Sequence, residues 1–288
     1  MAEAGLLRIG ELSRRSGVSP ELLRAWERRY ELLQPTRSDG GLRLYSEGDV
    51  ERVRATQRHL ASDLAAAEAA RLAATDETRP TPMALAPEGA RAELASAFSA
   101  FDEARAHAVL DGVLAGSTMD TALAGVIVPY LHELGERWEA GEATVAEEHF
   151  ASGVLRGRLL GLARDWGRGL GPRVLLACAP GEQHDLGLIA FGLALRARGW
   201  RVGYLGQDTP LDSVAAAAAA FVPTFVVVSS VDADRFESHA DELRTLADAQ
   251  RLCLGGTGAV NAKLDVDAIR LSADPVAEAD RLTELVPR

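Results

Sequence analysis

One short segment of the 288-residue chain carries a histidine in a place where it could bind a metal ion. Residues 181–187 read GEQHDLG and directly follow an apolar run that is typical of a buried strand. His184 can direct one ring nitrogen at a metal, while Glu182 accepts a hydrogen bond from the other nitrogen and raises the basicity of the ring. A single histidine on a loop is more often an ordinary surface residue, so this candidate metal site needs support from its surroundings.

Arginines near the N-terminus form a second group of candidate residues. The run 8–30, RIGELSRRSGVSPELLRAWERRY, has the spacing of a helix-turn-helix, in which Gly17 allows a left-handed helix end and Ser19 caps the next helix. Arg24 and Arg28 lie one turn apart on that second helix. Such guanidinium groups can bond to phosphates and to guanine edges in a DNA groove.

A hairpin is expected directly after these helices. Asp39 and Gly40 separate two extended segments, which is a strong hairpin signal, and Arg37 and Arg43 flank the turn. The alternative is that all these arginines form the solvated face of a helical protein. The candidate DNA-binding residues are Arg14, Arg15, Arg24, Arg28, Arg29, Arg37, Arg43 and Tyr45.

The charge of the chain is divided unevenly. A net charge of −11 argues against a nucleic-acid partner, but residues 8–58 hold 11 arginines against 8 acidic residues. This asymmetry indicates a small basic head on an acidic body. No apolar run approaches the roughly 20 residues of a membrane span, and the N-terminus turns polar too soon for a signal peptide. Two cysteines far apart in apolar runs indicate core thiols, so we expect a protein of the reducing cytoplasm, associated with the nucleoid.

The chain divides by pattern into three folded parts and a linker. Residues 1–74 read as short helices with one hairpin, and the proline-rich residues 75–87 serve as a tether. Between 88 and 169 apolar residues recur at threes and fours, which predicts a four-helix bundle.

Residues 170–288 have a different sequence pattern, in which short apolar runs alternate with longer helical stretches. This alternation predicts a doubly wound, Rossmann-like parallel sheet, so the whole chain is a multidomain α and α/β protein. The carboxyl ends of all strands then lie on one edge, where ligands bind and where His184 is expected. The expected strands are 173–179, 200–205, 225–229 and 251–255, and the expected helices are 186–198, 211–220 and 235–249.

The N-terminal run resembles the winged helix-turn-helix head of the mercury-resistance-regulator family over residues 7–60. The likeness rests on RAWERRY, LLQP, GGLRLY and DVERV in that order. It implies an operator of double-stranded DNA as partner. Glu31 departs from the pattern, because many relatives place glycine after the tyrosine, and the end of the helix could therefore differ.

The loop of His184 resembles the D-x-H-x-x-G signature of cobalamin-binding domains, with glutamate in place of the aspartate. The resemblance implies that His184 replaces the cofactor's dimethylbenzimidazole as lower cobalt ligand, and that the freed nucleotide tail enters the sheet. A serine pair and a glycine pair at later strand ends fit the same pattern, although Val231 stands where leucine is preferred. The implied cofactor-binding residues here are Glu182, His184, Asp185, Gly187, Ser229, Ser230, Val231, Gly255 and Gly256.

Trp138, Glu148 and His149 resemble the W-x9-E-H signature of light-sensing cobalamin repressors of the carotenoid-gene type. Without that context the pattern would be a core tryptophan before a solvated acidic helix start. The resemblance implies that the tryptophan packs against the adenosyl group above cobalt and that the other two help enclose it. Glu139 stands where light-sensing members carry a second histidine ligand, and His132 lies on another side of the helix.

These resemblances together imply a transcription regulator rather than an enzyme. We expect a repressor that binds adenosylcobalamin or another cobalamin. The bound form would be a dimer or tetramer, and light would change this oligomeric state. RNA polymerase would be affected indirectly, and no membrane is involved. In one alternative the regulator responds to cobalamin but not to light, and the glutamate at position 139 favours this alternative. A corrinoid carrier for methyl transfer is a further alternative, in which the DNA-binding head would have no role.

Overall fold

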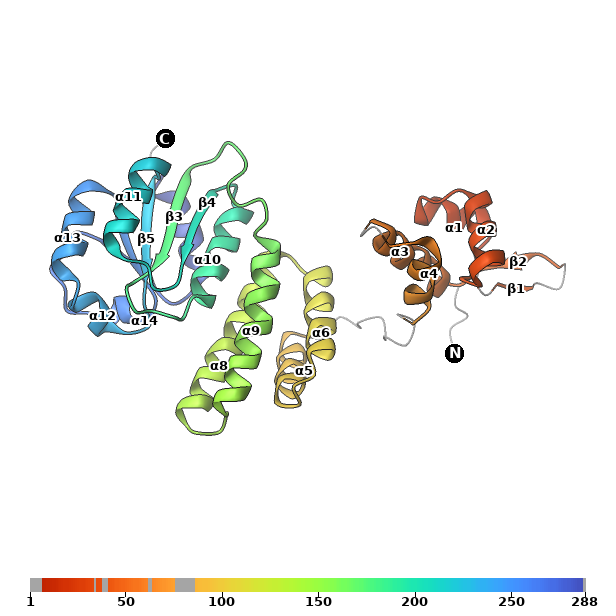
Figure 1. The fold of residues 1–288 in the computed structure, drawn as a ribbon, viewed down its shortest axis with the longest axis horizontal. Coiled ribbons are helices and arrows are strands. Elements are labelled where there is room, and N and C mark those ends of the chain that lie inside the picture. The colour runs from red at the N-terminus through yellow and green to blue at the C-terminus, as the bar shows by residue number, and fades with distance from the viewer. Residues whose placement is uncertain (1–6, 34, 38–40, 62–63, 76–85, 287–288) are drawn as a thin grey trace. The chain divides into compact units, whose positions relative to one another are not determined.

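The computed structural model describes residues 7–33, 35–37, 41–61, 64–75 and 86–286. The chain forms two compact units that divide between residues 83 and 84 (Figure 1). Most of the expected linker and the expected turn at Asp39 and Gly40 lie outside the described residues. No helix in the described ranges is long and apolar enough to cross a membrane.

Helix ends in the first unit follow from single residues. Gly17 ends α1 in the left-handed conformation at φ 72°, and the side chain of Ser19 accepts a hydrogen bond from the backbone N–H of Leu22. Glu31 ends α2 at φ 52°, so this helix keeps a glycine-like end although the residue is not glycine. The elements are α1 (Ile9–Ser16), α2 (Pro20–Tyr30), β1 (Thr36–Arg37), β2 (Arg43–Leu44), α3 (Glu47–Ala61) and α4 (Ala66–Thr75).

The first unit has a small core of its own. Leu12 and Leu23 from the two helices of the helix-turn-helix pack with Tyr45 and Val53, all with 0% exposure. Strands β1 and β2 pair in antiparallel register, which places Arg37 opposite Arg43. The winged helix-turn-helix predicted from the sequence is therefore present.

The second unit begins with helices that form a bundle, as predicted. Figure 1 shows α8 and α9 side by side with α5 and α6 next to them. Three of the assigned segments, α7, η2 and α8, are continuous and act as one long helix. The bounds are α5 (Pro87–Ser99), α6 (Glu103–Gly116), α7 (Met119–Ala122), η2 (Leu123–Ile127), α8 (Val128–Glu139) and α9 (Val145–Leu162).

A proline inside the long helix explains its short π-helical segment. Pro129 has no N–H, so it cannot donate to the carbonyl of Gly125 four residues earlier. The chain widens into η2 at this point, and Arg91 of α5 donates from Nη1 to the carbonyl of Gly125 at 2.9 Å. Arg91 also pairs with Glu133 at 2.9 Å, so one side chain satisfies the disturbed turn and fixes α5 against it.

A five-stranded parallel sheet follows, with the strand order β4-β3-β5-β6-β7. Four strands were predicted from their apolar runs, and the two-residue β7 is an addition that is too short to leave such a run. The predicted helix 235–249 is two helices, because His239 between them leaves the helical conformation. The bounds are β3 (Arg173–Cys178), α10 (Leu186–Ala197), β4 (Arg201–Gly206), α11 (Leu211–Phe221), β5 (Phe225–Ser229), α12 (Ala233–Glu237), α13 (Ala240–Ala249), β6 (Leu252–Gly255), α14 (Thr257–Asn261), β7 (Ile269–Arg270) and α15 (Pro275–Glu284).

The order of the strands creates a crevice at one edge. Helices α10 and α15 cover one face of the sheet and α11 and α13 cover the other (Figure 1). The connections after β3 and after β5 leave toward opposite faces, which is the switch point where doubly wound sheets bind ligands. The bundle packs on α10 through α7 and α9, and Arg198 joins Asp120 of the bundle to Asp280 of α15 with bonds of 2.6–3.1 Å.

Candidate functional site

The loop after β3 holds His184 by a buried carboxylate. Glu182 has 0% exposure, and its Oε1 accepts hydrogen bonds from His184 Nδ1 at 2.7 Å and from the His184 backbone N–H at 2.8 Å. The side chain of His184 is itself 70% exposed. Because Nδ1 donates to the carboxylate, Nε2 of the neutral ring is the nitrogen left with a lone pair.

The other oxygen of Glu182 reaches the end of β5. Its Oε2 accepts from Ser230 Oγ at 2.7 Å and from the Val231 backbone N–H at 2.9 Å, and Arg235 Nε lies 3.8 Å away. Burial alone would raise the pKa of Glu182, but the hydrogen bonds from His184, Ser230 and Val231 outweigh it and lower that pKa to about 2. The bond to Glu182 in turn raises the pKa of His184 above its ordinary value.

Small residues line the strand ends around this loop. Gly256 has φ 84°, and a Cβ there would lie 2.4 Å from the carbonyl oxygen of Ser230, so only glycine fits. A Cβ on Gly255 would make ordinary contacts of 3.9 Å and more, one of them with Ser229 Oγ. Gly187 is exposed, and no atom lies within 4 Å of a Cβ built there, so the first turn of α10 borders open space.

The bundle carries the other candidate residues on α8 and α9. Trp138 is 51% exposed near the end of α8, and His149 is exposed in the first turns of α9. The carboxylate of Glu148 is close enough to His184 to raise the pKa of its ring. The negative charge of Glu148, on the bundle helix α9, therefore adds to the effect of Glu182 on the ring of His184.

Asp185 lies beside the site without being open to it. Its side chain is 2% exposed, and Oδ2 accepts from Arg156 Nε at 2.8 Å and from Tyr204 OH at 2.6 Å. In this structure the carboxylate is turned into the protein and bonded there, and the cofactor contact predicted for Asp185 stays a prediction.

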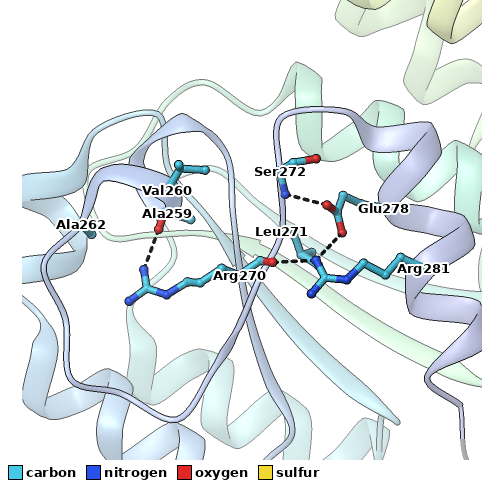
Figure 2. A pocket seen from close by; sticks show the side chains of 8 residues that line it. All are labelled: Ala259, Val260, Ala262, Arg270, Leu271, Ser272, Glu278 and Arg281. Atoms are coloured by element: carbon cyan, nitrogen blue, oxygen red, sulfur yellow. Dashed lines mark hydrogen bonds and ion pairs between the residues drawn. The ribbon is translucent and has the colours of Figure 1, made fainter.

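Two cavities lie on the α/β part. The one in Figure 2, about 400 Å³, adjoins α14, which begins directly after Gly256. Its polar groups bond to one another, as Glu278 does with the Ser272 backbone N–H at 2.9 Å and with Arg281 at 3.1 Å. The second, about 580 Å³, lies between α11 and α13. The first cavity is lined by Ala259, Val260, Ala262, Arg270, Leu271, Ser272, Glu278 and Arg281.

The candidate DNA-binding arginines are exposed in the first unit. Arg24, Arg28 and Arg29 are exposed on α2, and Arg37 is exposed on β1. Arg43 is tied by Nε to Glu27 at 2.9 Å but remains half exposed. Two further candidates, Arg14 and Arg15, pair with Glu11 on α1.

Tyr45 differs from the arginines among the predicted DNA contacts, because it is buried. Its side chain has 0% exposure, and its hydroxyl donates to Glu27 Oε2 at 2.9 Å. Its contact with DNA stays a prediction. Burial raises the pKa of this tyrosine to about 12. Glu27 of α2 thus holds both Tyr45 and Arg43, and so fixes the wing against the second helix of the helix-turn-helix.

Comparison with known proteins decides the family. The MerR HTH family regulatory protein model matches residues 7–75, and two B12 binding domain models match residues 90–160 and 172–275. The HTH-type transcriptional repressor CarH of Myxococcus xanthus is 36% identical over 257 residues, which cover 84% of this chain and 84% of that protein. The repressor CarA of the same organism is 36% identical over 262 residues, covering 88% and 87%. The chain belongs to this family of MerR-type regulators with B12-binding domains.

Membership in the MerR-type family establishes a DNA-binding transcription regulator with a B12-binding part, and not an enzyme. A solved structure agrees with the fold of the B12-binding part. The monomethylamine corrinoid protein of Methanosarcina barkeri superposes with a TM-score of 0.55 at 18% identity, covering 67% of this chain and 96% of that one.

Several residues of this MerR-type regulator's site were missed by the sequence reasoning. Arg156, Tyr204 and Arg235 touch the carboxylates of the loop, and Glu147 is buried between Ser99 and Arg137 beneath the start of α9. None belongs to the motifs that were recognised. No signal in the sequence pointed to them, because the burial of the carboxylates that need these donors is visible only in the fold.

Proposed function

We propose that the protein is a cytoplasmic repressor whose binding to double-stranded DNA is controlled by adenosylcobalamin. Residues 1–74 would bind DNA, and the bundle 88–169 and the sheet 170–288 would hold the cofactor between them. The observation that carries this proposal is the exposed imidazole of His184. Its Nδ1 is fixed by a buried carboxylate at the switch-point edge.

The residues present fit a cobalamin in which His184 would be the lower cobalt ligand. The ligand would be the imidazole of His184, whose Nδ1 is held by Glu182, which is the arrangement that orients a histidine for a metal. Open space borders Gly187, where a bulky ring system needs room. Ser229, Gly255 and Gly256 keep side-chain volume low at the strand ends, where the nucleotide tail would enter.

Trp138, Glu148 and His149 would enclose the upper face of the cofactor. The exposed indole offers an apolar surface to an adenosyl group, and the two polar side chains offer hydrogen bonds. Adenosylcobalamin supplies a cobalt–carbon bond that light can break. Trp138 would pack against the adenosyl group, so loss of that group would remove a contact that holds the bundle to the sheet.

Control of transcription would follow from assembly. A cofactor that favours one packing of bundle against sheet also favours the oligomer built on that packing, here a dimer or tetramer. Several heads in one oligomer bind repeated half-sites more tightly than one head does. Arg24, Arg28, Arg29, Arg37 and Arg43 would contact DNA, and exclusion of RNA polymerase would be an indirect result.

The test is reconstitution of the full chain with adenosylcobalamin, followed by absorption spectra, sizing and DNA band shifts before and after green light. We expect a spectrum in which the cofactor's own base is displaced, a larger oligomer in darkness and weaker DNA binding after illumination. His184→Ala should bind cofactor weakly and lose that spectrum, while His107→Ala on α6 serves as a matched control. Unchanged oligomer size and DNA affinity under light would contradict the light response.

The second candidate function is a regulator that responds to cobalamin without light. Glu139 next to Trp138 is exposed and carries a carboxylate where light-sensing relatives are expected to carry an imidazole. Such a protein would respond to the presence of a corrinoid. DNA binding measured in darkness, with and without adenosylcobalamin, methylcobalamin and hydroxocobalamin, separates the two functions, because only the second predicts full control without illumination.

A further inference from the structure

Asp185 precedes the first turn of α10, but its carboxylate does not cap that helix and is bonded to other elements. It occupies the N-cap position of α10, where aspartate is favoured because it can accept from the N–H groups of the first turn. No such bond forms, and Oδ2 accepts instead from Arg156 at 2.8 Å and from Tyr204 at 2.6 Å. Two distant elements have overridden a local preference, which is a mark of functional constraint.

Arg156 connects the bundle to the loop of His184. It belongs to α9, whereas Asp185 directly follows His184 at the edge of the sheet. A bond between a guanidinium and a carboxylate at this distance is among the stronger hydrogen bonds in proteins. Because Asp185 is buried, loss of Arg156 would leave the carboxylate of Asp185 as an uncompensated buried charge.

Helix α9 also carries Glu148 and His149, the residues proposed to enclose the upper face of the cofactor. Glu148 and Arg156 are separated by about 12 Å along α9, at 1.5 Å of rise per residue. A helix of this length is stiff, so attaching Arg156 to Asp185 also fixes how high Glu148 and His149 stand above the loop.

We propose that Arg156 is a positioning residue that sets the gap between α9 and the His184 loop and thereby selects cobalamins with a large upper ligand. This inference rests on the proposed function. An adenosyl group would occupy this gap beside Glu148 and His149, so its binding would depend on where α9 holds these two side chains. A hydroxo ligand does not reach them, so its binding depends on the gap much less.

The experiment measures affinities of the full chain for adenosylcobalamin and hydroxocobalamin in darkness. The variants are Arg156→Gln, Arg156→Lys, and Arg156→Gln combined with Asp185→Asn, which removes the uncompensated charge. The matched control is Arg158→Gln, because Arg158 lies on the same helix but pairs with Asp111 inside the bundle. Hydrogen exchange at the backbone amides of residues 185–189 in the cofactor-free chain is a second readout.

We expect Arg156→Gln and the double variant to weaken adenosylcobalamin binding by about ten- to hundredfold and hydroxocobalamin binding clearly less. Arg156→Lys should restore part of the difference, and Arg158→Gln should keep the wild-type ratio. Exchange at residues 185–189 should be faster in Arg156→Gln. An unchanged ratio of affinities with intact binding would overturn this inference alone. Failure of the wild-type chain to bind either corrinoid would overturn the proposed function as well, while the exchange rates would still test the attachment itself.

Discussion

At the scale of single residues, the site depends on a carboxylate that stays charged without any exposure to water. Glu182 has hydrogen-bond donors on both oxygens, from His184 on one side and from Ser230 and Val231 on the other. These bonds replace the hydration that burial removes. The charge in turn fixes the proton on Nδ1 of His184, so the orientation of the imidazole is settled before any ligand arrives.

This pair predicts how stability varies with pH. The pKa of His184 is raised in the folded chain, so its contribution is present below the unfolded pKa of about 6.5 and is lost as pH rises through the folded value. The pKa of Glu182 is lowered to about 2, so its contribution is present above about 4.5 and is lost as pH falls toward about 2.

Glu182→Gln should therefore lower the free energy of unfolding most between those limits. Denaturant unfolding of the cofactor-free chain across pH, with the exposed Glu136→Gln as control, checks this expectation. In the same variant the pKa of His184, followed by NMR, should fall toward its ordinary value. An equal loss of stability at every pH would mean that Glu182 acts only through packing.

The arginines of α2 are the other residue-scale prediction. Arg28→Ala should weaken binding to a DNA site selected by the chain from a random pool by about 1–3 kcal/mol, because an exposed guanidinium that reads a base is lost. Arg168→Ala, an exposed arginine of the second unit, should leave the band shift unchanged. A normal band shift for Arg28→Ala would remove this residue from the DNA contacts.

At the scale of elements, the sequence predicted the helix ends and strands that depend on neighbouring residues. The left-handed end at Gly17, the cap at Ser19 and the four long strands all follow from residues close in sequence, and the structure confirms them. The strand β7 and the break at His239 escaped prediction, because each is too short to change an apolar pattern. The bond between Arg156 and Asp185 could not be predicted, because it joins residues of two elements that only the tertiary fold brings together.

The π-helical segment shows how one element depends on another. Arg91 of α5 satisfies the carbonyl of Gly125, which Pro129 leaves without a donor inside the long helix. Arg91→Met should lower the free energy of unfolding by about 1–3 kcal/mol, because a carbonyl and the carboxylate of Glu133 lose their partner. Arg105→Met breaks an exposed pair with Glu93 and should have a clearly smaller effect when the thermal unfolding of both variants is measured. Equal effects of both variants would contradict this role for Arg91.

At the scale of the whole molecule, charge separates the two tasks of the chain. Residues 8–58 carry more arginine than acid, while the whole chain has a net charge of −11. An acidic sensor is repelled by DNA phosphates, so productive contact is confined to the winged head. Regulation then requires that ligand binding in one unit changes how many heads are presented together, which is the coupling we propose.

The central claim is that Nε2 of His184 binds cobalt, and one spectrum tests it most directly. The full chain is produced with histidine labelled by the heavier nitrogen isotope and loaded with reduced, paramagnetic cobalamin, and its electron paramagnetic resonance is compared with that of unlabelled protein. Our account predicts that the label changes the nitrogen splitting from a triplet to a doublet in the wild-type chain, and that His184→Ala abolishes this change. A triplet that the label leaves unaltered would show that cobalt keeps the cofactor's own base, and would contradict the account.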